Sequence, residues 1–533
     1  MSETFYITTP IYYPNGEPHL GSVYTTTICD VLAQYHRFIG DQTYFLTGTD
    51  EHGIKMTKAA AEQGIEPGVL AERYATLFKQ VWQELHISFD DFLRTTEPRH
   101  KSAVQNIVRK YVENGDIYLG SYQGWYDEGQ EEFVTETEAK NNEFKSKISG
   151  KPLTRYSEPT YFFRLAKYVP AIIQHIESHP DFIVPVGRRN EVLSKLRAGV
   201  DDLSISRATL KWGIEMPNDP QHVVYVWIDA LTNYITALGY AGTSETSSPS
   251  ASAIATPKPG PSGPGSSLFQ TYWPANVHVI GKDILWFHSV YWPAMLLSLG
   301  LPLPKTIAAH GWWVSGGRKA GKSTGGITPL SEIRQLITTH SLDALRYYLL
   351  RAAPFGSDLE WSQEEFDKSF NELANVVGNL LNRTLNMIKK YRGAVPAGNP
   401  TEDIDRNLVA ATTALPSQIK QAYEKLDLQQ VVMLPIELAR TANGYIDATR
   451  PFSLAKDPNQ SARLDTVLNL AAAATKNVLV SLLPVLTTKA RDGLKQLGID
   501  VEGKSIEQLF EIQLTAGHTL GEAVPLFPRV EAK

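Results

Sequence analysis

The groups best suited to chemistry in this sequence stand in its first fifty residues. Residues 5–9 are β-branched and aromatic, which is typical of a buried strand, and Pro10 ends that run. From Gly21 onward, apolar residues recur at helical spacing. His19 and Ser22 therefore lie where a helix begins, and the first amide groups of a helix lack partners and carry its positive dipole end. This turn is a candidate site for a phosphate group.

A second polar loop follows a second predicted strand. Residues 43–47 favour a strand and run into the sequence GTDEHG at 48–53, which contains Asp50. Loops that follow neighbouring parallel strands meet at the carboxyl edge of the sheet, where folds of this kind bind ligands. A lone histidine such as His19 is nevertheless more often an ordinary loop residue, so its assignment depends on the rest of the chain.

A glycine-rich stretch at residues 316–323 raises a competing hypothesis. Its sequence, GGRKAGKS, fits the pattern G-x-x-x-x-G-K-[ST] of P-loop NTPases. A P-loop needs a helix that begins at the Lys-Ser pair, so that the helix amides hold the phosphate. The next residues are TGGITP, and two glycines with a proline disfavour such a helix. We therefore do not expect a P-loop here.

Composition bounds the remaining possibilities. The length of 533 residues predicts two to four domains, and a hydrophobic content of 42% is ordinary for a globular protein. No run of about 18 apolar residues could cross a membrane, and the first strand begins too early for a signal peptide, so we expect a cytoplasmic protein. Cys29 is the only cysteine, which excludes an intrachain disulfide. With a net charge of −6, an RNA partner would have to bind to local basic patches.

Three blocks of sequence, in one order, resemble the methionyl-tRNA synthetases, a family of class I aminoacyl-tRNA synthetases. The blocks are FYITTPIYY at 5–13, PHLGS at 18–22 and TGTDEHG at 47–53. Further blocks, among them HVIGKDILWFH at 278–288, extend the resemblance to nearly the whole chain. It implies a bacterial-type enzyme that activates L-methionine with ATP, releases pyrophosphate and transfers the methionyl group to the 3′ end of tRNA(Met). Such an enzyme serves protein synthesis, including initiation.

The resemblance also implies an α/β fold. A Rossmann-like parallel-sheet catalytic domain would carry an inserted connective-peptide domain and would be followed by a C-terminal α-helical anticodon-binding bundle. The expected segments are the first catalytic half at 1–116, the insertion at 117–220, the second catalytic half at 221–330, a linking stem-contact region at 331–362 and the helical domain at 363–533.

Two local expectations concern the second catalytic half. The apolar run 223–228 is expected to form a buried parallel strand, with a helix from Asp229 onward. Residues 242–267 consist mostly of Ser, Pro, Gly, Ala and Thr, and are expected to form a disordered surface loop. Beyond residue 363 the apolar spacing predicts helices throughout.

Site residues follow from the resemblance, position by position. The residues implied in catalysis are His19, Ser22, Lys319 and Lys322. The residues implied in ATP binding are His19, Gly21, Ser22, Gly281, Asp283, Lys319, Lys322 and Ser323. The residues implied in methionine binding are Pro10, Ile11, Tyr13, Asp50, Trp227, Ala230, Leu231, Tyr234, Ile284 and His288. Taken alone, Trp227 and Ile284 would more often be core residues. Residues 319–323 take the place of a mobile lysine clamp, in which Ala320 replaces the usual methionine.

The tRNA contacts are also implied by the resemblance. They are Asn386, Lys390 and Phe452, and Phe452 stands where many relatives have a tryptophan that stacks on an anticodon base. A basic helix face with no acidic residue nearby is formed by Arg383, Lys389, Lys390 and Arg392. By itself, such a face would indicate only a solvated surface. The chain lacks the additional C-terminal module that makes some relatives dimeric, so we expect a monomer.

Metal binding is expected to be limited to Mg²⁺ that accompanies ATP and is held mainly by its phosphates. Relatives often carry a zinc knuckle of Cys-x-x-Cys pairs in the insertion. Here Asp127 and Gln130 stand in place of the first pair, and residues 141–148 contain no cysteine. Zinc requires thiolate or imidazole ligands in a closed tetrahedron. We therefore expect no structural zinc, and a loop held by packing around Trp125 and Tyr126.

Two alternatives remain beside the P-loop NTPase. A class I synthetase for another aliphatic amino acid would usually carry a large editing domain, and an insertion of about a hundred residues is too short for one. A non-catalytic tRNA-binding relative would keep the helical bundle and lose His19, Asp50 or the lysines, all of which are present.

Overall fold

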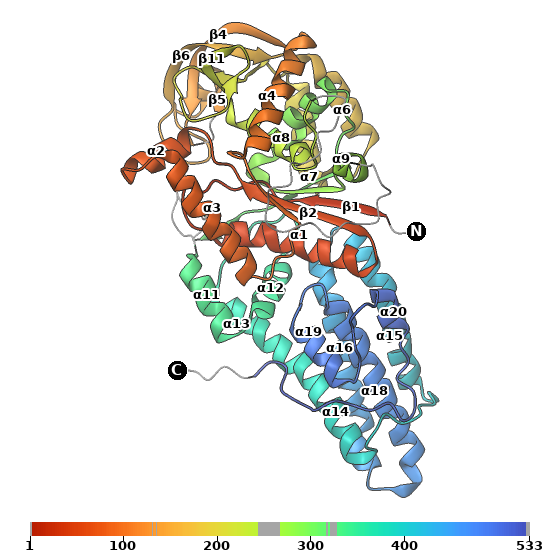
Figure 1. The fold of residues 1–533 in the computed structure, drawn as a ribbon. Coiled ribbons are helices and arrows are strands. Elements are labelled where there is room, and N and C mark those ends of the chain that lie inside the picture. Colours follow the sequence, from red (N-terminus) through yellow and green to blue (C-terminus); the bar gives the residue numbers. More distant parts are fainter. Residues whose placement is uncertain are drawn as a thin grey trace. The chain divides into compact units, whose positions relative to one another are not determined.

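The computed structural model describes residues 3–129, 132–134, 136–242, 267–315, 318–319 and 328–528. The chain forms two compact units (Figure 1). The first unit comprises Met1–Ala33 and Gln42–Leu330, and the second comprises Gln34–Asp41 and Ser331–Lys533. The expected disordered loop and the clamp residues 320–323 lie almost wholly outside the described part of the chain.

The first unit is built on a parallel sheet of six strands in the order β3-β2-β1-β12-β13-β7. Its strands are β1 (Thr4–Thr8), β2 (Gln42–Thr49), β3 (Asp91–Arg94), β7 (Ile183–Val184), β12 (Val277–Gly281) and β13 (Thr306–His310). Every pair of neighbours is parallel, and Ile7 of β1 lies opposite Phe45 of β2 and Val277 of β12. The chain order reverses between β1 and β12. In open parallel sheets, a ligand crevice forms outside the carboxyl ends of the strands at such a point.

Helices cover both faces of this sheet, as Figure 1 shows for α1 on one face and for α4 and α8 on the other. The helices of this unit are α1 (Leu20–Phe38), α2 (Ile54–Glu62), α3 (Pro67–Glu84), α4 (Pro98–Glu113), α5 (Glu136–Asn141), α6 (Val169–Ser178), α7 (Val186–Arg197), α8 (Val226–Thr236), α9 (Leu268–Tyr272) and α10 (Trp292–Ser298). One continuous apolar core lies between the sheet and α4, α8 and α10. This burial fixes the strand ends that carry the loops described below.

The insertion forms two small antiparallel sheets. One has the order β5-β4-β6-β8, from β4 (Ile117–Asp127), β5 (Glu132–Val134), β6 (Thr154–Phe163) and β8 (Leu203–Ser204). The other has the order β10-β11-β9, from β9 (Ser206–Arg207), β10 (Glu215–Met216) and β11 (Asp219–Val224).

Aromatic packing holds the loop of the insertion, as predicted. The rings of Trp125 and Phe144 lie 4.7 Å apart, and the guanidinium of Arg207 lies 5.4 Å from the ring of Tyr126. Gln130 lies outside the described residues. In the described part of the chain, no group of three His, Cys, Asp or Glu side chains could hold a metal ion. The absence of structural zinc stays a prediction.

The prediction for residues 223–228 was wrong. Strand β11 ends at Val224 and runs antiparallel to β9 and β10, and helix α8 already begins at Val226. Every residue of α8 except Trp227 is buried. The start of the helix is therefore apolar on nearly all sides. It lacks the polar face by which a helix can be told from a buried strand in a sequence.

The second unit is helical. Its helices are α11 (Leu330–Thr339), α12 (Leu342–Arg351), α13 (Gln363–Glu372), α14 (Asn379–Tyr391), α15 (Asp403–Glu424), α16 (Leu428–Thr449), α17 (Pro451–Leu454), α18 (Ser461–Leu482), α19 (Lys489–Gln496) and α20 (Ile506–Glu511). Helices α15, α16 and α18 pack against one another, and α18 is buried along most of its length. Among the described helices of both units, none is long and apolar enough to span a membrane.

Two expectations for this unit need correction. The chain is not helical to its end, since residues 512–528 form neither helix nor strand. This segment contains two glycines and two prolines, which disfavour a helix. The basic face of α14 is not without acidic neighbours: Arg383 Nη2 lies 2.5 Å from Asp447 Oδ1, and Arg392 pairs with Asp465. These carboxylates come from other helices, so their proximity could not be read from neighbours in the sequence.

Candidate active site

The start of α1 lies directly after β1 and fixes the orientation of His19. The amide of Gly21 donates to His19 Nδ1 at 3.1 Å, so Nδ1 is an acceptor and the hydrogen of the neutral ring stands on Nε2. Ser22 Oγ donates to the His19 carbonyl at 2.8 Å and accepts from the His19 amide at 2.9 Å. The single hydroxyl hydrogen of Ser22 is thus already used to close the first turn. Ser22 holds the helix start, and His19 presents an N–H group beside it.

The loops after β1 and β2 meet, as the sequence predicted. Tyr12 forms a parallel bridge with Thr49, and the Asp50 amide donates to the Tyr12 carbonyl at 2.9 Å. The Tyr12 hydroxyl lies 2.8 Å from Thr26 Oγ1 of α1, which joins both loops to that helix. At Gly48 an added Cβ would lie 2.0 Å from the carbonyl oxygen of Leu93, so only glycine fits between these strands.

Asp50 directly precedes two residues that are firmly anchored, Glu51 and His52. The neighbouring Glu51 is fully buried and accepts from both Arg94 Nε, at 2.6 Å, and Arg94 Nη2, at 3.1 Å. Trp212 Nε1 also donates to the Glu51 carbonyl at 2.6 Å. A two-pronged guanidinium–carboxylate pair gives geometric precision as well as attraction. Glu51 therefore fixes the backbone that carries the 3% exposed Asp50.

The second anchored residue, His52, belongs to a buried cluster with Asp229 and His100. His52 Nδ1 lies 2.7 Å from Asp229 Oδ2, and His100 Nε2 lies 2.7 Å from Asp229 Oδ1. Burial by itself would raise the pKa of Asp229, but the charge of His52 and the hydrogen bonds of both histidines outweigh it and lower the pKa to about 2. Asp229 stays ionised and ties the loop after β2 to α8 and α4.

Helix α8 and the segment after β12 form a wall of aromatic and histidine side chains that contact one another. The Tyr234 hydroxyl lies 2.7 Å from His288 Nε2, and His288 Nδ1 lies 2.9 Å from the Ile284 carbonyl oxygen. A carbonyl oxygen only accepts, so Nδ1 carries the hydrogen and Nε2 accepts from the tyrosine. Burial lowers the pKa of His288 to about 4, and the ring is neutral near pH 7. Trp227 stacks on Phe287 with ring centres 3.8 Å apart.

Behind this wall, His278 joins the central strands. Its Nε2 accepts from Trp292 Nε1 at 3.2 Å, so its Nδ1 carries the hydrogen and lies 2.8 Å from Thr8 Oγ1. Burial lowers the pKa of His278 well below its usual value. The neutral ring completes a chain of hydrogen bonds from β1 through β12 to α10.

The turn after β12 contributes Gly281 and Asp283. An added Cβ at Gly281 would lie 2.6 Å from Asp283 Oδ1, so the carboxylate folds over a position that glycine leaves open. Asp283 Oδ1 accepts from Trp312 Nε1 at 3.1 Å, and His310 Nε2 lies 2.7 Å from Thr25 Oγ1 of α1. These contacts bring the ends of β12 and β13 beside the start of α1.

The candidate residues gather unequally. Those implied for methionine and most of those implied for ATP lie in the loops after β1 and β2, at the start of α1, in α8 and in the segment 281–288. The backbone of Lys319 lies in β15 (Arg318–Lys319), where it pairs with Val314 of β14 (Trp313–Ser315). Lys322 and Ser323 lie outside the described residues. Asn386, Lys390 and Phe452 belong to the second unit, where all three are exposed.

Comparison with known proteins identifies the family. The family model described as tRNA synthetases class I (M) matches residues 5–143 and 137–385. A methionine–tRNA ligase of Enterococcus faecalis is 42% identical over 544 aligned positions, which cover 100% of this chain and 78% of that protein. One from Caldanaerobacter subterraneus is 40% identical over 535 positions, which cover 100% of this chain and 80% of that protein. The chain belongs to the methionyl-tRNA synthetases.

A solved structure agrees with this assignment. Mycobacterium tuberculosis methionyl-tRNA synthetase in complex with methionyl-adenylate is 36% identical and matches with a TM-score of 0.90, over 99% of this chain and 100% of that one. The expected fold is confirmed, and so is the activity of a methionine–tRNA ligase, with methionine, ATP and tRNA(Met) as substrates. The P-loop NTPase, the synthetase for another amino acid and the non-catalytic relative are thereby set aside.

Sequence reasoning missed the residues that support this synthetase site. Arg94, His100, Asp229 as an ion-pair partner, His278 and Trp292 carry no local signal, because their partners lie far away in the chain. His100 and Asp229, for example, are 129 positions apart. A polar residue such as Asp229 within a strongly apolar segment is the one hint that the sequence offered, since buried charges require partners.

Proposed function

We propose that the adenylation site of this synthetase lies outside the carboxyl ends of β1 and β12. ATP would lie at the start of α1 and over the turn after β12, and methionine would lie against α8. The observation that carries the proposal is that His19, Asp50 and Asp283 follow β1, β2 and β12, whose carboxyl ends lie at one edge of the sheet beside the point where the strand order reverses.

Activation is attack of the methionine carboxylate on the α-phosphate of ATP, with pyrophosphate as the leaving group. The step needs two anions held in line and positive potential where negative charge develops. The Nε2–H group of His19 would donate to a phosphate oxygen, beside the amides of the α1 start. Ser22 acts through the geometry of this turn, because its hydroxyl hydrogen is used by the His19 carbonyl. Loss of one such donor typically lowers the rate by about 10²- to 10³-fold.

Methionine binding would use the buried Asp50 carboxylate for the α-ammonium group. The side chain would lie among the other implied contacts, which are Pro10, Ile11, Tyr13, Trp227, Ala230, Leu231, Tyr234, Ile284 and His288. A mostly apolar and aromatic pocket suits a polarizable thioether. The neutral Tyr234–His288 pair adds polarity without a net charge. An analogue that differs by one methylene would be rejected by only about 1–3 kcal/mol.

The remaining ATP contacts would be Gly21, Gly281, Asp283, Lys319, Lys322 and Ser323, with the two lysines closing over the leaving pyrophosphate. Mg²⁺ would accompany ATP and be held mainly by its phosphates. Bound there, Mg²⁺ would neutralise part of the phosphate charge. The alanine at position 320 is a smaller apolar residue than the methionine usual in relatives.

Recognition of tRNA(Met), including the initiator, would use Asn386, Lys390 and Phe452 in the helical unit. Phe452 is 54% exposed, and an exposed aromatic ring is a stacking platform for an unpaired base. We further propose a cytoplasmic monomer with the domain boundaries given above. Light scattering at working concentrations tests the oligomeric state: a mass near 59.2 kDa supports a monomer, and twice that value contradicts it.

Exchange of pyrophosphate into ATP, with each of the twenty amino acids offered separately and no tRNA present, tests the adenylation site. We expect exchange with methionine, and none of similar efficiency with the other amino acids. A substitution of His19 by Asn should lower the exchange rate by about 10²-fold or more at unchanged folding. Exchange that persists at the wild-type rate in this variant would contradict the role of His19.

A further inference from the structure

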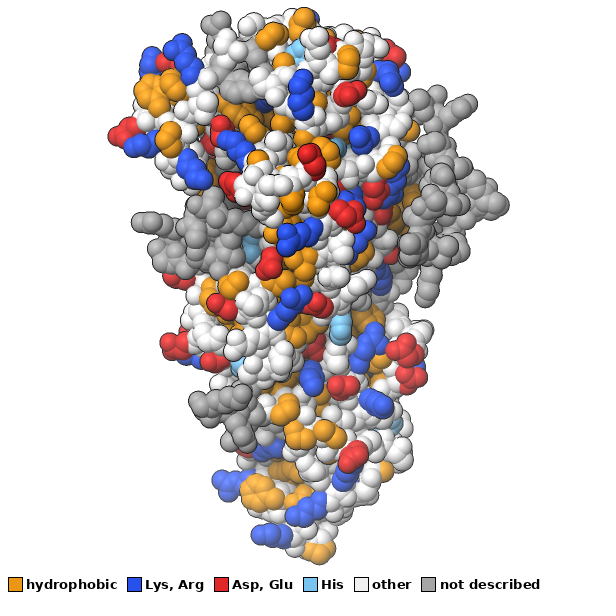
Figure 2. All heavy atoms as spheres, turned by 60° about the vertical axis from the view of Figure 1, so that its left-hand side comes forward, with side chains coloured by type: hydrophobic (Ala, Val, Ile, Leu, Met, Phe, Trp, Pro, Cys, Tyr) orange, Lys and Arg blue, Asp and Glu red, His pale blue; other side chains and the backbone are white. Residues whose placement is uncertain are grey.

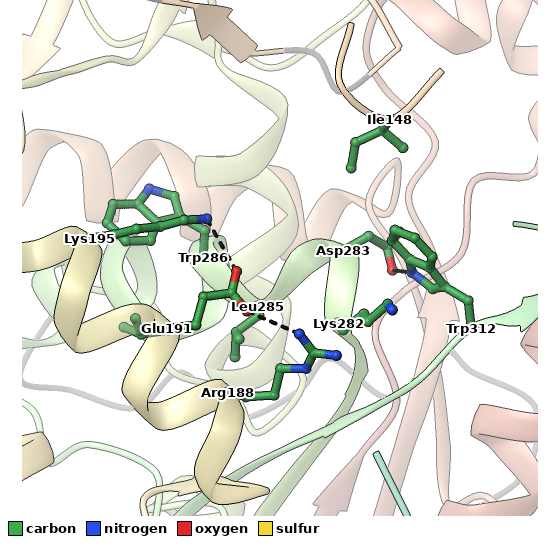
Figure 3. Close-up of a pocket in the computed structure, with 10 residues that line it drawn as sticks. Ile148, Arg188, Glu191, Lys195, Lys282, Asp283, Leu285, Trp286 and Trp312 are labelled. Atoms are coloured by element: carbon green, nitrogen blue, oxygen red, sulfur yellow. Dashed lines mark hydrogen bonds and ion pairs between the residues drawn. The ribbon is translucent and has the colours of Figure 1, made fainter. Parts of the chain in front are cut away.

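A cavity beside the proposed adenylation site is lined mostly by residues that have no role assigned above. We call it the α7 pocket. It has a volume of about 270 Å³ and is lined by Ile148, Arg188, Glu191, Val192, Lys195, Lys282, Asp283, Leu285, Trp286 and Trp312. Figure 3 shows the side chains of α7 on one side and Lys282, Asp283 and Trp312 on the other. Three cations, two carboxylates and two indole rings therefore surround a space large enough for part of a nucleotide.

The cations of α7 can exchange their present partner for a phosphate. Arg188 Nη1 donates to Glu191 at 3.0 Å, and Lys195 Nζ donates to the same carboxylate at 3.3 Å. In each ion pair the two partners are about one helical turn apart on α7. Glu191 is 43% exposed, and ion pairs on a solvated helix face are weak. A phosphate carries more charge than one carboxylate, and a guanidinium binds it in a two-pronged geometry.

The indole rings offer flat surfaces next to these cations. Lys195 Nζ lies 5.7 Å from the centre of the Trp286 ring, and Lys282 Nζ lies 4.0 Å from the centre of the Trp312 ring. The hydrogen bond from Trp312 Nε1 to Asp283 fixes the plane of that ring. Cations that follow a phosphate backbone, with aromatic rings on which bases stack, are the two components of binding sites for single-stranded nucleic acid.

The position of the α7 pocket points to one nucleic acid. Asp283 belongs both to this pocket and to the proposed ATP contacts, so the pocket opens where the adenylate would form. We propose that the α7 pocket binds the single-stranded 3′-terminal nucleotides of tRNA, with phosphate on Arg188 and Lys195 and a base against Trp286. The inference rests on the proposed adenylation site, because the accepting hydroxyl must reach that site.

Two assays separate this role from others. Pyrophosphate exchange without tRNA reports adenylation alone, and aminoacylation of tRNA(Met) reports adenylation and transfer together. The double substitution Arg188→Ala/Lys195→Ala should raise the KM for tRNA by about 10-fold or more and leave exchange within about two-fold. Trp286→Ala should act in the same direction by roughly 5-fold or more, and Trp286→Phe should retain most of the wild-type value. Unchanged exchange also shows that each variant is folded.

Glu191 provides a test of opposite sign. Glu191→Gln removes the carboxylate that competes with the phosphate, so it should lower the KM for tRNA. If the ion pairs had only a structural role, Glu191→Gln and Arg188→Ala would change the KM for tRNA in the same direction. Arg197→Ala is the matched control, because Arg197 lies on the same helix, pairs with Glu177 at 2.5 Å and does not line the pocket. It should leave both assays unchanged.

Other outcomes overturn the inference. A raised KM for ATP in exchange would assign the pocket to ATP, and wild-type kinetics in both assays for the double variant would show that the pocket binds neither ligand. An equally raised KM for tRNA in Arg197→Ala would show that the effect comes from the overall charge of α7 and not from the pocket. Failure of the adenylation proposal itself is distinguishable, since the wild-type chain would then show no methionine-dependent exchange.

Discussion

The carboxyl edge of the parallel sheet and the exposed face of the helical unit differ in how they hold the side chains proposed to bind substrates. At the sheet edge, Asp50 is 3% exposed and its neighbours Glu51 and His52 are buried and hydrogen-bonded to Arg94 and Asp229. In the helical unit, Phe452 is 54% exposed, and Asn386 and Lys390 also face solvent.

The difference follows from the size of the substrates. A small molecule is bound by groups that are ordered before it arrives, so the site must be part of the core. A large RNA can be met by exposed side chains that contribute nothing to folding. On the face shown in Figure 2, basic and acidic side chains are interspersed, with no single basic surface of large extent. Specific exposed residues, more than overall charge, should therefore decide tRNA binding.

The largest effect is expected at the buried edge. Asp50→Asn keeps the shape of the side chain and removes the charge that would hold the ammonium group of methionine. We expect kcat/KM for methionine in pyrophosphate exchange to fall by about 10²-fold or more, as for loss of one partner of a buried ion pair. Glu17→Gln, at an exposed position shortly before His19, is the control and should leave exchange unchanged. A value for Asp50→Asn within two-fold of wild type would contradict the role of Asp50.

The two kinds of ion pair should also differ in their contribution to stability. Asp229→Asn places an NH₂ group against one of two histidine N–H donors, and should lower the free energy of unfolding by about 2–5 kcal/mol. Asp447→Asn breaks only the pair with Arg383, in which Asp447 is 68% exposed, and should cost less than about 1 kcal/mol. Urea denaturation of both variants measures the difference. Similar costs would show that burial does not separate the two regions in the way proposed.

The exposed face gives a smaller and more selective effect. Phe452→Ala should raise the KM for tRNA(Met) in aminoacylation by roughly 5- to 100-fold, which is the loss of one stacked base, with exchange and stability unchanged. Phe452→Trp should bind tRNA at least as well as wild type. Val524→Ala is the control, because Val524 is 52% exposed in the same unit. An effect of Phe452→Ala on pyrophosphate exchange would contradict the view that this side chain serves tRNA binding alone.

The smallest expected effect concerns pH. Because burial lowers the pKa of His288 to about 4, only roughly one ring in thirty is protonated at pH 5.5. Protonation is disfavoured in the pocket, so a fall in pH should weaken methionine binding through His288 only below about pH 5. The KM for methionine should therefore stay level between pH 5.5 and 8.5. A rise in KM as pH falls through 6.5, absent from His288→Gln, would show that the ring titrates normally.

Much of this arrangement could be predicted from the sequence. The β1–α1–β2 unit, the meeting of the loops at residues 10–13 and 48–53, and the helical second unit all carry strong local patterns. The hydrogen bond between His288 and the Ile284 carbonyl, four positions earlier, also joins residues close in the chain. These features depend on residues close in the chain, where spacing and turn chemistry are informative.

The rest depends on partners that are distant in the chain. The Asp229 cluster, the Glu51–Arg94 pair and the acidic partners of Arg383 and Arg392 join elements whose proximity only the fold determines. The start of α8 was misread for a related reason, since a helix buried on nearly every side loses its periodic signal. Sequence reasoning thus named the residues proposed to touch substrate and missed most of those that hold the surrounding backbone in place.

The most direct test of the central claim is a crystal structure of this protein with a non-hydrolysable analogue of methionyl-adenylate. We expect the adenosine outside the carboxyl ends of β1 and β12, the ammonium group within hydrogen-bond distance of Asp50, and the thioether against the Tyr234–His288 pair. An analogue bound elsewhere, for instance in the α7 pocket with Asp50 unused, would contradict it.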